Sequence, residues 1–74
     1  MELTTSTIRV LRRKDVREAI EKDGLDAFIS FWWVVTQTGN GLDRLEEMCL
    51  FSGVAFQQPF PMIMEGLVRW AYSN

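Results

Sequence analysis

The sequence predicts an all-α fold, a compact bundle of about four short helices in a single domain spanning residues 1–74. Glycines interrupt the chain at positions 24, 39, 41 and 53, and the segments between them contain few other helix breakers. Apolar residues in those segments recur at the spacing of one helix face. A chain this short buries only about 60% of its unfolded surface, which leaves no material for a second core.

The first clear helix is predicted over Arg13 to Asp23. Its apolar residues Val16, Ala19 and Ile20 fall at helical spacing, and charged side chains occupy the rest of the cylinder. Gly24 stands where a C-terminal cap is expected. The segment therefore contributes a narrow apolar face to the bundle.

Three alternatives remain open for the segment before this helix, residues 1–12. Ile8 and Val10 alternate with Arg9 in a short TIRVL run. Such a run is compatible with an edge strand, an extended arm or an early turn of the first helix.

The second helix is predicted over residues 25–38, and its residues are apolar nearly all round. Placing them at 100° steps puts one core-facing stripe at Leu25, Phe28, Ile29, Trp32 and Val35. Phe31 extends the apolar arc sideways. Trp33 emerges beside the polar strip that contains Asp26 and Gln37, so this indole is predicted to face solvent.

The third helix is predicted to follow a turn at Gly39–Gly41. Asp43 followed by Glu46 has the spacing of a capping box, and we expect the helix to run from there to about Ser52, before Gly53. Its apolar stripe consists of Leu42, Leu45, Met48 and Cys49.

The fourth helix is predicted to begin at Pro59 and Pro61, because proline is tolerated in the first turn, and to run to about Tyr72. Its inward-facing residues are Phe60, Ile63, Met64, Leu67, Trp70 and Ala71. Glu65 and Arg69 form an i,i+4 pair on the outside.

No catalytic, metal-binding or cofactor-binding residues are predicted, and no small-molecule substrate is implied. The chain has no histidine, the commonest general base and metal ligand. Cys49 lies on an apolar stripe with no imidazole to activate it, which favours a buried structural thiol. Asp43, Glu46 and Glu47 crowd a helix start, where the helix dipole already favours negative charge. A non-enzymatic protein is therefore expected.

The N-terminal segment is the only basic region of a chain whose net charge is −2 and whose pI is about 4.9. Its candidate contacts with nucleic acid or an acidic partner are Arg9, Arg12, Arg13, Lys14 and Arg17. A nucleic-acid-binding transcriptional regulator is accordingly the second hypothesis. It is disfavoured because the overall pI is acidic and because the next helix consists of Phe, Ile, Trp and Val instead of polar donors that read base edges.

A protein-interaction role is the first hypothesis, since the helices supply more apolar bulk than a tiny core can use. Trp33, Phe51 and Met62 each emerge among charged or polar residues, and with Phe31 they are the candidate partner-binding residues. We expect an adaptor or inhibitor that binds a larger protein, a second copy as a homodimer, or both. Small helical proteins of this type are frequent among phage and mobile-element products.

A cytoplasmic, reducing location is expected. One cysteine cannot form an internal disulfide, and small secreted domains usually contain several cysteines. The N-terminus lacks the apolar region of a signal peptide, and the longest apolar run, residues 27–35, is too short to span a bilayer.

Overall fold

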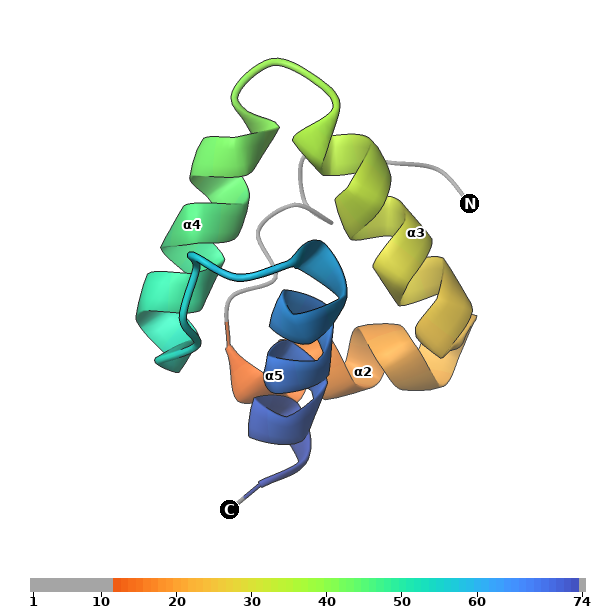
Figure 1. The fold of residues 1–74 in the computed structure, drawn as a ribbon. Coiled ribbons are helices and arrows are strands. Elements are labelled where there is room, and N and C mark those ends of the chain that lie inside the picture. Colours follow the sequence, from red (N-terminus) through yellow and green to blue (C-terminus); the bar gives the residue numbers. More distant parts are fainter. Residues whose placement is uncertain (1–11, 74) are drawn as a thin grey trace.

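The computed structural model describes residues 12–73, which form four helices joined by short connections (Figure 1). The helices are α2 (Arg13–Asp23), α3 (Leu25–Thr36), α4 (Gly41–Ser52) and α5 (Phe60–Tyr72). No strand occurs among these residues, so the predicted all-α class is confirmed. The N-terminal segment for which a strand, arm or helical turn remained open lies outside the described residues, apart from Arg12.

The helices surround one core without forming parallel layers. In Figure 1, α3 and α4 descend from a shared turn at the top, α2 crosses behind the lower part, and α5 stands in front. α2 packs against both α3 and α5, and α4 also contacts α3 and α5. The backbones of α3 and α5 do not pack closely against each other, a separation that shapes the molecular surface described below. None of the four helices combines the length and apolarity that a membrane crossing requires.

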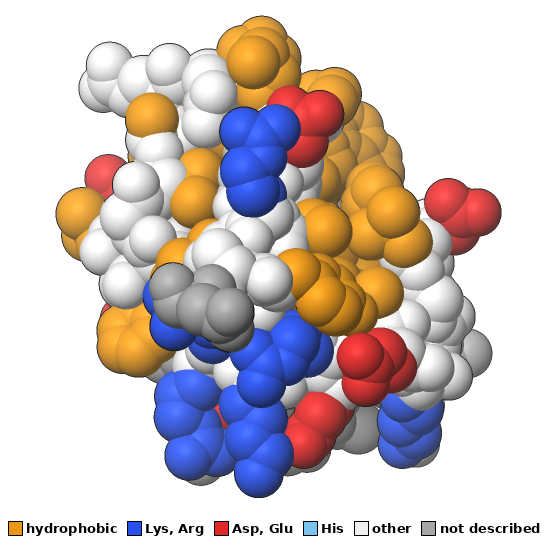
Figure 2. Space-filling model, turned by 90° about the horizontal axis from the view of Figure 1, so that it is seen from below, with side chains coloured by type: hydrophobic (Ala, Val, Ile, Leu, Met, Phe, Trp, Pro, Cys, Tyr) orange, Lys and Arg blue, Asp and Glu red, His pale blue; other side chains and the backbone are white. Residues whose placement is uncertain are grey.

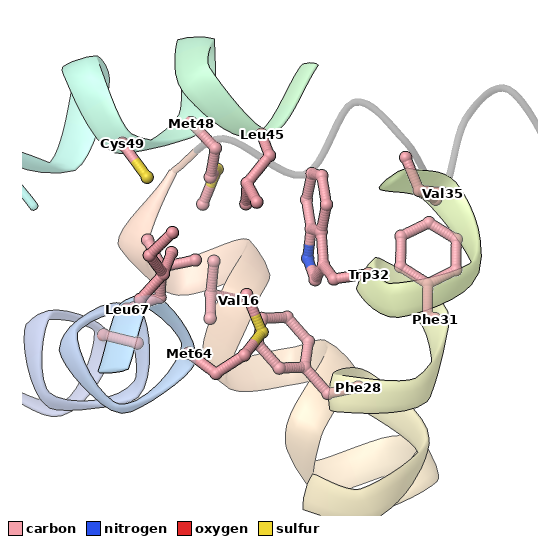
Figure 3. Packing of buried hydrophobic residues seen from close by; sticks show 12 residues of the cluster. Val16, Phe28, Phe31, Trp32, Val35, Leu45, Met48, Cys49, Met64 and Leu67 are labelled. Atoms are coloured by element: carbon pink, nitrogen blue, oxygen red, sulfur yellow. The ribbon is translucent and has the colours of Figure 1, made fainter. Parts of the chain in front are cut away.

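The core is made of apolar side chains from all four helices. Side chains from different helices converge in the close-up of Figure 3, with Trp32 extending from α3, Leu45 from α4, Met64 from α5 and Val16 from α2. Trp32 is only 1% exposed and is the largest of the fully buried side chains. Among the described residues no polar or charged side chain is buried, so the interior has no internal polar network to satisfy.

The predicted bounds of the first and fourth helices are confirmed, whereas α3 ends at Thr36 and not at residue 38. The backbone tightens there into turns in which the Gln37 amide donates to the carbonyl oxygen of Val34 at 3.0 Å and the Thr38 amide donates to that of Val35 at 3.2 Å. Two threonine hydroxyls support this end of the helix. Thr36 Oγ1 donates to the carbonyl oxygen of Trp33 at 2.7 Å, and Thr38 Oγ1 donates to that of Val35 at 3.1 Å.

The predicted capping box of Asp43 and Glu46 is wrong. The helix begins two residues earlier, at Gly41, and its N-cap residue Asn40 makes no side-chain cap hydrogen bond. Asp43 consequently lies inside the first turn, where its negative charge still suits the helix dipole. The early start is enabled by Gly41, which is buried against the end of α3 where a larger residue would not fit.

Several residues predicted to face the core are only partly covered. Leu25 and Leu42 are exposed, and Ile29 and Trp70 are half-buried. Leu25 and Ile29 lie on the side of α3 that faces α5, where no close helix packing covers them. Helical periodicity identified the apolar side of each segment, but at Leu25 and Ile29 no closely packed helix covers that side.

Candidate functional site

An open groove of about 660 Å³ lies between α3 and α5, and we call it the α3–α5 groove. Seven of its nine lining residues are apolar or aromatic over most of their surface: Leu25, Ile29, Phe60, Pro61, Met64, Val68 and Tyr72. Figure 2 shows hydrophobic side chains gathered over this side of the molecule, whereas most Lys and Arg side chains gather at the opposite edge of the view. The groove has about twice the volume of a second hollow, of about 300 Å³, that adjoins it.

Helical periodicity explains how two segments line one groove. On α5, residues 60, 64, 68 and 72 are spaced at i,i+4, which places them one above another along a single side of the helix. On α3, residues 25 and 29 have the same spacing. Met64 is only 2% exposed and forms part of the floor, because it also packs in the core.

Trp33 extends the apolar surface beyond one end of the α3–α5 groove. Its ring packs edge-on against Phe60, with the ring centroids 5.1 Å apart. A second hollow of about 300 Å³, lined by Trp33, Leu42 and Phe56 among others, adjoins this contact. Phe60 lines both hollows, so the two meet there and form one continuous, mainly apolar surface from Leu25 to Leu42, with Thr36, Gln37 and Gln58 as polar members of the second hollow.

The three residues predicted to project from the helices are exposed in the structure. Trp33 is 53% exposed, Phe51 57% and Met62 51%. They do not form a single patch. Phe51 packs edge-on against Trp70 at 6.1 Å, and neither Phe51 nor Met62 lines the α3–α5 groove. Only Trp33 borders the continuous apolar surface.

Phe31, the fourth candidate partner-binding residue, is buried and the expectation that it reaches a partner needs correction. It is 4% exposed and belongs to the core cluster. Its ring makes an edge-on contact with Trp32 at 5.6 Å. The sideways extension of the apolar arc on α3 therefore faces the interior and not the surface.

The described members of the basic cluster have two different surroundings. Arg12 donates from Nε to Asp15 at 2.9 Å, and this hydrogen bond lowers the pKa of the Asp15 carboxyl. Lys14 lies 4.0 Å from Glu18 on the exposed side of α2. Arg9 lies outside the described residues.

Arg13 and Arg17 instead bind the C-terminal end of α5. Arg13 Nε donates to the carbonyl oxygen of Trp70 at 2.8 Å, and Arg17 donates to that of Ala71 at 2.9 Å. The Arg13 guanidinium also lies over the Trp70 ring, 5.3 Å from its centroid. Positive charge is favoured at a helix C-terminus, where carbonyls lack amide partners. These two arginines thus fasten α2 to α5.

Replacing Arg17 with methionine is expected to lower the free energy of unfolding by about 1–2 kcal/mol, since a charged donor to the α5 terminus is lost. Urea denaturation followed by circular dichroism measures the change. Lys14→Met is the matched control, because it removes the same charge from the same helix but only a 4.0 Å exposed pair. We expect it to change stability by less than about 0.5 kcal/mol. Equal effects of the two substitutions would contradict a role for Arg17 at the α5 terminus.

Among the described residues, reactive side chains do not form a cluster at the candidate site. Burial raises the pKa of the Cys49 thiol, and the nearby Glu46 carboxylate raises it further, so the thiol stays protonated at neutral pH. The pKa of Tyr72 is raised mainly by desolvation and also by Glu21, to which its hydroxyl donates at 3.4 Å. Among the described residues no group of three or more acidic or cysteine side chains is placed to hold a metal ion.

Comparison with protein-family models, curated proteins and solved structures found no match for this chain. The candidate site is therefore defined by its own geometry. Sequence reasoning missed most of the α3–α5 groove, since it assigned Leu25 and Ile29 to the core and singled out neither Val68 nor Tyr72. The i,i+4 series on α5 was the available signal, because it makes the apolar arc of that helix wider than one core contact requires.

Proposed function

We propose that this protein is a non-enzymatic interaction domain that binds a protein, either a larger target or a second copy, through its exposed aromatic and aliphatic surface. The observation that supports this role is the continuous apolar surface formed by the α3–α5 groove and Trp33. A domain of this kind acts as an adaptor or an inhibitor by occupying part of its target.

Apolar surface exposed to water is costly. Removing it from water is favourable by roughly 25 cal/mol per Å², before the entropy cost of association is subtracted. Leu25, Trp33 and Tyr72 are all more than two-fifths exposed and border the same hollowed region. Contiguous apolar patches, especially with large aromatic anchors, are typical of interaction sites in soluble domains. A partner that covers this surface gains area that the small core leaves uncovered.

The alternative role, nucleic-acid binding by the basic N-terminal region, has less support. Arg13 and Arg17 donate to carbonyl oxygens of α5, and Arg12 and Lys14 lie beside Asp15 and Glu18. The carbonyl bonds occupy donors of Arg13 and Arg17 that a phosphate would need, and the two carboxylates offset the charges of Arg12 and Lys14.

Site-specific photo-crosslinking in the native cells tests the proposed function. p-Benzoylphenylalanine in place of Trp33 or of Tyr72 is expected to form discrete protein adducts, because both aromatic side chains border the exposed apolar surface. The same probe in place of Glu18, on the exposed side of α2, serves as the control and should form none. Absence of adducts at both aromatic positions, or nucleic-acid adducts from a probe at Lys14, would overturn the proposal.

A further inference from the structure

We infer that the α3–α5 groove binds an amphipathic helix of a partner protein whose apolar stripe is flanked by lysine or arginine. This inference rests on the proposed function and specifies the chemistry of the partner. Shape supports a helix, and the charges along the rim support basic flanks.

The groove has two walls, one from α5 and one from α3. The i,i+4 series on α5, from Phe60 to Tyr72, spans about 18 Å at 1.5 Å per residue. That length matches about three turns of a helix lying in the groove. Leu25 and Ile29 form the opposite wall from α3, whose backbone does not pack closely on α5. Two helix walls with an open, apolar floor are the geometry in which an amphipathic helix inserts residues at i, i+3, i+4 and i+7.

Around the groove, carboxylates outnumber cations. Glu65 and Arg69 line it and pair with each other at 3.5 Å, so they nearly cancel. At one end Glu21 accepts the Tyr72 hydroxyl, and the charge of Arg17, which donates to the carbonyl oxygen of Ala71, offsets part of that of Glu21. Asp26 is exposed next to Leu25 on α3 and adds a further negative charge. These two carboxylates have no cation among their described hydrogen-bond and ion-pair partners. In Figure 2 acidic side chains border the hydrophobic patch, and some basic side chains adjoin it as well. Such a rim attracts basic flanks and repels acidic ones.

The same charges disfavour a second copy of this chain as the occupant. In a second copy, the helix that could enter the groove with exposed apolar side chains is α4, where Leu50 is 79% exposed. Asp43, Glu46 and Glu47 surround Leu50 on the helix cylinder, so this side would bring further carboxylates to an acidic rim. The exposed side of α2 carries both basic and acidic side chains and displays no large hydrophobic residue among those described.

Binding of designed peptides tests the inference. The probe is a fluorescent helical peptide of about 14 residues with leucines at i, i+4, i+7 and i+11 and lysines beside them, and its twin has glutamates in place of the lysines. We expect the lysine peptide to bind at least about tenfold more tightly at low salt, and this preference should shrink as salt rises. Equal binding, or tighter binding of the glutamate peptide, would overturn the inference.

Two pairs of variants locate the peptide. Val68→Gln is expected to weaken binding of the lysine peptide about tenfold, whereas Leu50→Gln, an equal loss of apolar character on α4, should leave it unchanged. Asp26→Lys should weaken binding about threefold to fivefold, and Glu47→Lys, with the same change of charge, less than about twofold. If the members of either pair have equal effects, the peptide is not in the α3–α5 groove and the inference fails.

Amide chemical-shift mapping on the unmodified chain provides a readout that does not depend on folding of any variant. The lysine peptide should perturb residues lining the groove, such as Ile29 and Val68, and not Leu50. Sedimentation of the free protein tests whether a second copy of the chain occupies the groove instead. A dimer that Val68→Gln converts to a monomer would overturn the inference. If photo-crosslinks still form at Tyr72 while the lysine peptide fails, the partner chemistry is wrong and the proposed function stands. If neither photo-crosslinks nor binding of the lysine peptide is observed, the proposed function is overturned as well.

Discussion

Replacing Trp32 with alanine is expected to lower the free energy of unfolding by about 3–5 kcal/mol. The indole is 1% exposed and its removal leaves a cavity among side chains of three other helices. A domain of 74 residues has a total stability of about 4–11 kcal/mol at the usual value per residue. The variant should therefore be close to unfolding at room temperature. Urea denaturation monitored by far-UV circular dichroism measures the loss.

The neighbouring Trp33 provides a matched control, because the same substitution one residue later removes an indole that is 53% exposed. Its edge-on contact with Phe60 is worth about 0.5–1.5 kcal/mol, so Trp33→Ala should cost roughly that amount. If Trp33→Ala destabilises the domain as much as Trp32→Ala, the assignment of the two faces of α3 is wrong. Trp70→Ala should fall between them, since Trp70 is half-buried beneath Arg13 and beside Phe51.

The sequence predicted the helices well because each begins or ends at a residue with a strong local effect. Gly24, with φ of 94°, separates α2 from α3, and Gly53, with φ of 79°, ends α4. Pro59 precedes α5 as its N-cap and Pro61 lies in its first turn. The start of α4 was mispredicted because it depends on contact between Gly41 and α3, which no local pattern reveals.

The candidate site was harder to predict than the helices. A helical wheel distinguished Trp32 from Trp33 correctly, since the two indoles point about 100° apart on one helix. It could not distinguish a stripe buried by a neighbouring helix from one left open, and so Leu25 and Ile29 were assigned to the core. Arg13 and Arg17 were treated as surface cations for the same reason. Their acceptors are backbone carbonyls more than fifty residues away along the chain, and backbone acceptors leave no trace in a pattern of side chains.

Replacing Gly41 with alanine is expected to lower the free energy of unfolding by about 3 kcal/mol or more. A Cβ built on Gly41 would overlap the carbonyl oxygen of Val35, and this oxygen belongs to the backbone of α3 and cannot rotate away. Relief requires α3 and α4 to move apart. That movement would disturb the core contact between Trp32 and Leu45, which holds the two helices together. Urea denaturation measures the cost.

Gly39→Ala in the same turn separates this overlap from the general effect of losing a glycine. Gly39 has φ of 42°, where an L residue is strained by about 1 kcal/mol, but a Cβ there meets nothing within 4 Å. Both substitutions reduce the entropy of the unfolded chain equally, so the difference between them reports the overlap at Gly41. Equal costs would mean that α3 and α4 are farther apart than described. An excess cost at Gly41 would instead show that the domain depends on the close approach of these two backbones, from which Trp33 and Leu42 project into the second hollow.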